Sequence, residues 1–414
     1  MVPKGWSSVQ AQDVCKSISV GVVIKPTQYY VPEGYGVKAF RSANVREGFI
    51  NDSDWVYFSH EGHAINKKSH LKTGDVLIVR TGYPGTACVV TPEFEGSNAI
   101  DIVIARPDMD KIIPEYLCAY TNSHIGKSQV LDLQGGMAQK HLNVGAYQVL
   151  KINLPPLREQ KKIAQILSTW DKAISVTEKL LTNSQQQKKA LMQQLLTGKK
   201  RLLDENGVRF STEWEFKRIS EIATRVQRKN DAAEHPILTI SSLSGFVRQD
   251  ERYSRYMAGE SVKNYILLKK GEFAYNKGNS KTYEFGCIFD LEAYEAGLVP
   301  HVYVCFRLKN GLSHRYFKYL FEADYLKPQL GALVNTGVRN NGLLNIKPTE
   351  FMQTKVPVPC FEEQESIADM LYNSSRTIRV LQDKLACLRD EKKALMQQLL
   401  TGKRRVKVDE AVAE

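Results

Sequence analysis

KKALMQQLLTGK at residues 188–199 recurs letter for letter at residues 392–403, a displacement of 204 positions. The displacement holds without a gap back to residue 152, and 22 of 50 positions are identical between residues 152–201 and residues 356–405. Self-similarity of this length is typical of a duplicated structural unit. The chain therefore contains two copies of one constant segment.

Each constant segment follows a longer segment in which the internal resemblance is faint and the displacement drifts. Trp6 matches Trp214 at a displacement of 208, whereas Asn143 matches Asn345 at 202. The two constant segments have the same length, whereas the two variable segments differ in length. This indicates that the constant segments fix the spacing of the molecule and that the variable segments differ in what they contact. We therefore divide the chain into variable domains 1–151 and 202–355, helical spacers 152–201 and 356–405, and a C-terminal tail, 406–414.

Both spacers are predicted to be long helices. The pair Pro155-Pro156 precedes a first turn that contains Glu and Gln, as helix starts prefer. Gly198 and Gly402 can take the left-handed conformation that ends a helix. A helix over 157–197 would be roughly 60 Å long at about 1.5 Å per residue. Apolar positions alternate by four and three, with a lysine at the same place in both copies, which predicts a coiled-coil seam.

Two arrangements of these helices are open. Each helix could pack on its own variable domain, or the two could form an antiparallel pair with the variable domains at opposite ends. The duplication, and the complementary sizes of Trp170 and Ser374, favour the pair. The residues expected to hold the pair and its partner interface together are Ile163, Leu167, Trp170, Ile174, Leu191, Leu195, Ile367, Leu371, Ile378, Leu385, Leu395 and Leu399.

The variable domains are predicted to be mixed α and β. Strand-like runs are punctuated by Gly, Pro and Asn turns; they lie at 75–80, 87–90, 99–105, 235–240 and 301–308. Short helices are expected at 114–123 and 314–326. The predicted fold class is α+β: two mixed α/β domains with pseudo-twofold symmetry, separated by a long antiparallel two-helix coiled coil.

Charge and cysteine content narrow the class of partner. The 414 residues carry a formal charge of +12, which favours a polyanionic partner. We find no run of eighteen apolar residues and no secretion signal at the N-terminus, so we expect a cytoplasmic protein that binds nucleic acid. The seven cysteines form no CxxC pair, which argues against a disulfide framework or a zinc knuckle.

Motifs for catalysis are not found in the sequence. The proline pair lies between Leu154 and Leu157, so it does not form the Asp/Asn-Pro-Pro-aromatic motif of amino-group methyltransferases. Gly126-Lys127-Ser128 ends like a P-loop, but Thr121 stands where the first glycine is needed. His60, His63 and His70 with Glu61 could be assembled into a metal site, but no fourth ligand is convincing, and solvent-exposed or DNA-facing histidines are favoured. We therefore expect no enzyme activity and no metal in this chain.

The pattern resembles the specificity subunits of type I restriction–modification systems over the whole chain. LPPLREQKKIAQIL at 154–167 and VPCFEEQESIADML at 358–371, each followed by the repeated helix end, look like the two conserved spacers of that family. GDVLIVRTG at 74–82 and GEFAYNKG at 271–278 look like the strand motif of its recognition domains. GGMAQKHLN at 135–143 and TGVRNNGLLN at 336–345 look like its glycine-led loops. Cys360 and Glu272-Phe273 depart from the usual pattern.

The resemblance implies a non-catalytic subunit that directs other subunits to DNA in phage defence. Each variable domain would be a target-recognition domain that reads one half of a bipartite double-stranded DNA site. Two modification subunits would methylate adenine N6 with S-adenosylmethionine, and restriction subunits would cut distant DNA with ATP and Mg. This chain itself would bind no cofactor.

The resemblance also implies where DNA contacts lie, because phosphate and base contacts need Arg, Lys, Asn or Gln on loops and strand ends. The expected contacts are Arg80, Thr81, Gln139, Lys140 and His141 in the first domain and Asn276, Lys277, Arg339, Asn340 and Asn341 in the second. The alternative is a stand-alone DNA- or RNA-binding scaffold that works without a methyltransferase.

Overall fold

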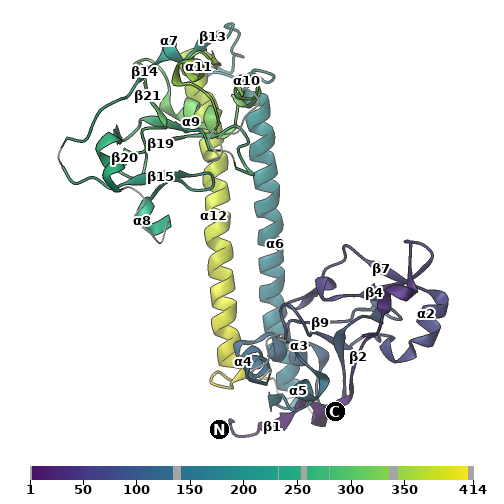
Figure 1. Cartoon of the computed structure of the whole chain (residues 1–414). Helices are drawn as coiled ribbons and strands as arrows, with labels where there is room; N and C mark the ends of the chain where they lie inside the picture. The colour runs from purple at the N-terminus through teal and green to yellow at the C-terminus, as the bar shows by residue number, and fades with distance from the viewer. Residues whose placement is uncertain are drawn as a thin grey trace. The chain divides into compact units, whose positions relative to one another are not determined.

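The computed structural model describes residues 2–133, 141–231, 233–252, 259–278, 280–334 and 344–408. The chain divides into two compact units: unit 1 contains residues 1–179 and 382–414, and unit 2 contains residues 180–381. Two long helices, α6 (Leu157–Leu195) and α12 (Phe361–Leu400), pass through both units (Figure 1). Each unit therefore contains one variable domain and one half of each long helix.

Unit 1 is built on a four-stranded antiparallel sheet in the order β2 (Cys15–Val20), β11 (Ile102–Pro107), β8 (Val76–Val79) and β9 (Ala87–Val89). A second sheet has the order β10 (Asn98–Ala99), β4 (Gly36–Phe40), β7 (Val56–Ser59) and β3 (Tyr30–Val31). Two-stranded pairs join β1 (Ser7–Gln10) to β12 (Lys151–Leu154) and β5 (Val45–Arg46) to β6 (Phe49–Ile50). The shorter helices are α1 (Ala11–Val14), α2 (His60–Ile65), α3 (Pro114–Asn122), α4 (His124–Leu133) and α5 (Val144–Gln148).

The central strand β8 explains why the run VLIV is apolar throughout. Side chains alternate between the two faces of a strand. Val76 and Ile78 pack in the core that includes α3 and the long helices, whereas Leu77 and Val79 pack in a second core on the opposite face. Both faces of this strand are covered, so a continuous apolar run replaces the usual alternation.

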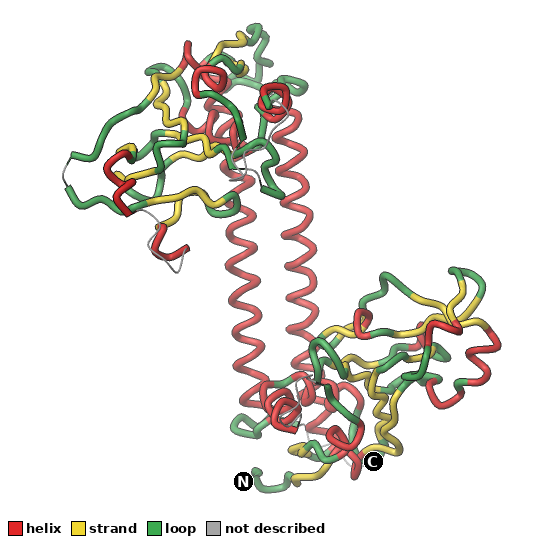
Figure 2. The backbone as a smooth tube through the Cα atoms, viewed as in Figure 1, coloured by secondary structure: helices red, strands yellow, loops and turns green. Residues whose placement is uncertain are grey.

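Unit 2 repeats this architecture. Its four-stranded sheet has the order β14 (Ala223–Arg225), β21 (Val304–Leu308), β18 (Phe273–Asn276) and β19 (Cys287–Asp290). Further pairs join β13 (Glu215–Arg218) to β22 (Lys355–Val358), β15 (Leu238–Ser241) to β16 (Gly245–Arg248), and β17 (Ile266–Lys269) to β20 (Ala296–Val299). Its shorter helices are α7 (Ile219–Ile222), α8 (Gln249–Arg252), α9 (His314–Glu322), α10 (Lys327–Leu333) and α11 (Pro348–Met352), and Figure 2 shows the same mixture of helix and strand in each unit.

The long helices begin and end where the sequence predicted. Both C-terminal glycines are left-handed, with φ of 70° at Gly198 and 69° at Gly402. Their amides donate to Leu195 and Leu399 respectively, which closes the last turn of each helix. Within unit 1 the helix halves are antiparallel, because residue 171 pairs with residue 392 and residue 178 with residue 389.

Every predicted seam residue is at least partly buried. Those that are buried are Ile163, Leu167, Leu195, Ile367, Leu371, Leu385 and Leu399, and those of intermediate exposure are Trp170, Ile174, Leu191, Ile378 and Leu395. The other arrangement, in which each helix packs on a variable domain, is also present at the helix ends. Ile163 and Leu399 lie in the core of unit 1, and Leu195 and Ile367 lie in the core of unit 2.

Three predicted strands start later than expected. The run predicted as one strand at 99–105 is broken at Asp101, which takes a left-handed φ of 49°, so β11 begins at Ile102. β15 begins at Leu238 because Pro236 has no amide hydrogen to donate to a ladder. β21 begins at Val304 because the preceding residues form a turn closed by the Tyr303 amide on the Pro300 carbonyl. Helix α9 ends at Glu322, where we expected residue 326, because Asp324 takes a left-handed φ of 55°. No helix among the described residues is long and apolar enough to cross a membrane.

Candidate nucleic-acid interface

The C-terminal end of β8 is joined to the segment that returns from the glycine-led loop of unit 1. The Arg80 carbonyl accepts from the Leu142 amide at 2.9 Å, and the Arg80 Nε donates back to the Leu142 carbonyl at 3.0 Å. The guanidinium also forms an ion pair with Asp101 and contacts Nε2 of His141. Arg80 is only 9% exposed, so its side chain positions its neighbours and offers little surface of its own.

Thr81 and His141 form the exposed part of this cluster. Thr81 Oγ1 lies 2.9 Å from Nδ1 of His141. A guanidinium only donates hydrogen bonds, so Nε2 of His141 accepts from Arg80, and Nδ1 carries the hydrogen that it donates to Thr81. The Thr81 hydroxyl then keeps its own hydrogen for an outside acceptor such as a phosphate or a base edge.

A rigid turn beside this cluster presents an aromatic ring that the sequence analysis missed. Tyr83 is 83% exposed. It lies between Gly82 and Gly85, both with φ near 90°, and the Gly85 amide donates to the Val79 carbonyl. The signal in the sequence was an aromatic residue between two glycines directly after the strand motif.

Unit 2 has an equivalent strand end. The Leu344 amide donates to the Lys277 carbonyl at 3.0 Å, as the Leu142 amide does to Arg80 in unit 1. Asn276 uses its Oδ1 to accept from the Gly278 amide at 3.0 Å. Asn276 and Lys277 are both of intermediate exposure. The predicted contacts Gln139, Lys140, Arg339, Asn340 and Asn341 lie outside the described residues.

A buried glutamate attaches each variable domain to the start of a long helix. In unit 2, Glu363 accepts from Arg201 at 2.6 and 2.7 Å and from Nε1 of Trp214 at 2.9 Å. In unit 1, Glu159 accepts from Arg405 and from Nε1 of Trp6 at 3.2 Å. The hydrogen bond to each glutamate raises the pKa of its arginine partner above the ordinary value. The sequence pointed to these groups as matched positions of the repeat, but their contact was not predicted.

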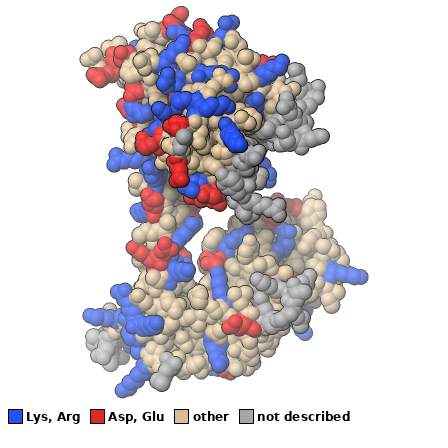
Figure 3. Space-filling view, turned by 60° about the vertical axis from the view of Figure 1, so that its left-hand side comes forward, with Lys and Arg blue, Asp and Glu red and all other residues tan. Residues whose placement is uncertain are grey.

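The residue after each glutamate extends the same attachment. Gln160 accepts from the Ile113 amide at 3.0 Å, and Gln364 accepts from the Ser313 amide at 2.9 Å. Each glutamine also donates to the carbonyl of the proline that precedes its helix. The start of each long helix is therefore attached to its variable domain by a glutamate and the glutamine that follows it. Figure 3 shows Lys and Arg side chains spread over one face, with acidic groups among them.

Two of the three histidines considered for a metal site, His63 and His70, differ from the expectation of exposed or DNA-facing side chains, whereas His60 is exposed as expected. His63 and His70 stack with their ring centroids 3.8 Å apart, and both are partly buried. Nδ1 of His63 lies 2.7 Å from the buried Asn98 amide, which packs them against the domain. Among the described residues no group of three His, Cys, Asp or Glu side chains is placed to hold a metal ion.

This stack predicts an acid-sensitive unit 1. Burial, and then the neighbouring His70 and His60, lower the pKa of His63. The unfolded state therefore binds a proton at a higher pH than the folded state, so stability is full above the ordinary histidine pKa and is lost as the pH falls below it. We expect the melting temperature of the full chain to fall from pH 8 to pH 5.5, and the fall to be smaller in His63→Gln. Parallel pH profiles for the two proteins would refute this assignment.

The chain matches proteins of one family. The model of the type I restriction modification DNA specificity domain matches residues 3–183. The type I restriction enzyme MjaVIII specificity subunit of Methanocaldococcus jannaschii is 25% identical over 437 residues, covering 98% of this chain and 94% of the relative. The EcoKI specificity subunit of Escherichia coli is 23% identical and covers 88% of this chain and 81% of its own length.

A solved structure has the same fold. The S subunit of a type I restriction–modification system from M. genitalium aligns with a TM-score of 0.55 at 13% identity, over 96% of this chain and 96% of that one. The sequence relatives and the solved structure both align with nearly the whole length of this chain, including the two repeated helical segments. Over nearly its whole length the chain is therefore similar to the specificity subunits of type I restriction–modification systems, and its residues 3–183 match the DNA specificity domain of that family.

Proposed function

We propose that this subunit recognises a bipartite DNA target, with one half-site read by the variable domain of each unit. The observation that carries the proposal is that both units repeat the same contacts at the end of the central strand and at the start of a long helix. The carbonyls of Arg80 and Lys277 accept equivalent bonds, and Gln160 and Gln364 attach the two domains to their helices in the same way. One chain then offers two equivalent sites that differ in side chains, which suits two half-sites of different sequence. The division into recognition domains 1–151 and 202–355, spacers 152–201 and 356–405, and tail 406–414 belongs to this proposal.

In this proposal the DNA contacts come from loops at the two strand ends. Thr81 and His141 would contact DNA directly in unit 1, and Arg80 would hold them in place because its guanidinium is already bound to Asp101. Gln139 and Lys140 of the glycine-led loop would join them in unit 1. Asn276 and Lys277 would take this role in unit 2, together with Arg339, Asn340 and Asn341 of the second glycine-led loop.

The subunit would direct modification and restriction subunits to the target. Two modification subunits would supply adenine N6 methylation with S-adenosylmethionine, and restriction subunits would supply ATP- and Mg-dependent cleavage. A groove of about 860 Å³ in unit 1 supports a partner surface on the long helices. Its lining includes the apolar residues Ile166, Trp170 and Leu395 and the basic residues Lys162, Arg404 and Lys407. Covering such an apolar surface is a common basis of subunit association.

Mapping of N6-methyladenine in cells with and without this chain tests the proposal. We expect deletion to remove methylation at a single motif made of two half-sites. His141→Ala should relax base preference in one half-site only, because it alters the cluster of one unit, while the other half-site stays intact. Unchanged methylation after deletion, in cells that contain active modification subunits, would favour the scaffold alternative.

A further inference from the structure

Two seam lysines occupy the same place in the repeat. Lys188 and Lys392 are separated by the repeat displacement of 204. Their side chains are only 14% and 19% exposed. A charged group at a seam position costs stability unless a partner charge lies beside it, and such a group also sets which surfaces can pack together. Each lysine is therefore expected to have a carboxylate partner close by.

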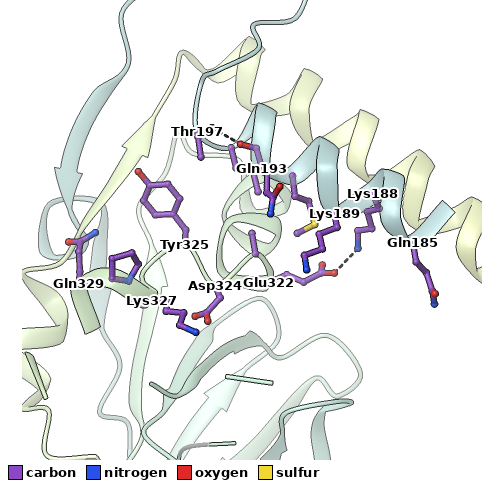
Figure 4. Close-up of a pocket in the computed structure, with 14 residues that line it drawn as sticks. Gln185, Lys188, Lys189, Gln193, Thr197, Glu322, Asp324, Tyr325, Lys327 and Gln329 are labelled. Atoms are coloured by element: carbon purple, nitrogen blue, oxygen red, sulfur yellow. Dashed lines mark hydrogen bonds and ion pairs between the residues drawn. The ribbon is translucent and has the colours of Figure 1, made fainter. Parts of the chain in front are cut away.

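The two lysines take their carboxylates from different parts of the chain. In unit 1, Lys392 Nζ lies 2.5 Å from Oδ1 of Asp171, which belongs to α6. In unit 2, Lys188 Nζ lies 2.6 Å from Oε1 of Glu322, the last residue of α9 in the variable domain (Figure 4). Lys188 also lies 5.3 Å from the ring centroid of Tyr319, on the same helix. The helix pair supplies the acid in one unit, and the domain supplies it in the other.

Each unit has a neutral residue where the other has its acid. The counterpart of Asp171 after 204 residues is Ser375. The counterpart of Glu322 is Asn122, because α3 and α9 are both nine residues long and end at these positions. Both helices are also attached to the long helices by the same glutamine contact. The lysine therefore occupies the same position in both units, whereas its carboxylate partner lies on the long helix in unit 1 and on the variable domain in unit 2.

The surroundings explain why position 122 does not supply the acid in unit 1. Asn122 Oδ1 accepts from the Ala87 amide at 2.9 Å, and its Nδ2 donates to the Ala87 carbonyl at 2.8 Å. A glutamate there could not donate, so one of these bonds to β9 would be lost. Asn122, Asp171 and Lys392 line one cavity of about 170 Å³ together with Glu47 and Glu115 of the first variable domain. The carboxylate that pairs with Lys392 is that of Asp171, whereas Glu47 pairs with Lys127.

Among the described residues, Ser375 in unit 2 makes no hydrogen bonds to a strand of the domain like those that Asn122 makes to β9 in unit 1. The Ser375 hydroxyl donates to the Leu371 carbonyl at 2.9 Å, a bond within its own helix, and lies 3.4 Å from the Tyr319 hydroxyl. The first contact lies within α12, and the second is a longer one to α9 of the variable domain. A carboxylate could therefore occupy this position, as Asp171 does in unit 1.

We propose that the placement of the carboxylate partner is a compatibility determinant between each variable domain and its helix pair. The helix pair of unit 2, with Ser375, accepts a domain that brings its own acid at the end of its α9 equivalent. The helix pair of unit 1, with Asp171, accepts a domain with a neutral residue there. The interaction surface thus selects its domain by charge, and this inference does not depend on the proposed function.

Moving the carboxylate within unit 2 tests the inference in the full-length chain. Glu322→Gln leaves Lys188 without its acid, and we expect the transition of unit 2 to fall by roughly 3–6 °C. Adding Ser375→Asp should recover at least half of that loss, because the new carboxylate would face Lys188 as Asp171 faces Lys392. The recovery should vanish when Lys188 is also replaced by methionine.

Each outcome decides the matter. No loss in Glu322→Gln would show that the lysine needs no carboxylate from the domain, and a loss that Ser375→Asp does not recover would show that the placement is not interchangeable. Either result overturns the proposal. If Glu322→Gln does not yield folded protein, folded protein from the double variant is the same recovery, and failure of both variants overturns the proposal as well. Hydrogen exchange in α9 locates the change in unit 2.

Discussion

Glu363→Ala is expected to lower the free energy of unfolding of unit 2 by about 3 kcal/mol, because it removes a fully buried carboxylate and leaves a partly buried arginine and a tryptophan N–H without this acceptor. The Glu363 side chain is fully buried and accepts from Arg201 and Trp214. Denaturant unfolding followed by hydrogen exchange measures the loss and places it. The loss should be concentrated where the variable domain meets α12.

The neighbouring glutamate provides a matched control. Glu362 is exposed and lies in the same first turn of α12. Its replacement by alanine should change stability by no more than about 0.5 kcal/mol. Glu159→Ala in unit 1 should cost less than Glu363→Ala, because the Glu159 side chain is 12% exposed. Equal losses in Glu362→Ala and Glu363→Ala would contradict the role given to the buried carboxylate.

Leu399→Ala is expected to destabilise unit 1 by about 3 kcal/mol, the usual cost of removing a fully buried leucine side chain. Leu399 is 2% exposed and packs in the core that contains Ile163 and Leu167. Although Leu399 lies near the end of the chain, hydrogen exchange should rise in α3 and β8 of the first variable domain. The measurement is peptide-resolved exchange of the full-length protein.

The equivalent residue of the repeat separates this effect from a general loss of stability. Leu195 is fully buried in the core of unit 2, so Leu195→Ala should raise exchange in α9 and β18 and spare the first domain. Val176→Ala is the neutral control, because Val176 is 57% exposed on α6. If Leu399→Ala and Leu195→Ala raised exchange in the same segments, the division into two packed units would be wrong.

The predicted surface cluster shows where reasoning from the sequence stops. Arg80 was selected as a DNA contact because arginine at a strand end suits phosphate or base recognition. The structure places its guanidinium on Asp101 and on the carbonyl of Leu142, far away in sequence. Exposure depends on these long-range neighbours, which no local pattern contains. Tyr83 was missed although it lies between two glycines after the strand motif, because only the fold shows that its side chain is exposed.

The sequence by itself determined the duplication, the long helices, their glycine ends and the positions of the main strands. These features follow from local rules, because periodicity, capping and β-propensity act over a few residues. Only the tertiary structure decided which groups meet across the repeat: Glu363 with Arg201, Glu159 with Arg405, and each seam lysine with a different acid. The two copies of the helix end are identical in sequence, so their different partners arise from the residues packed against them: Asp171 of α6 in unit 1 and Glu322 of α9 in unit 2.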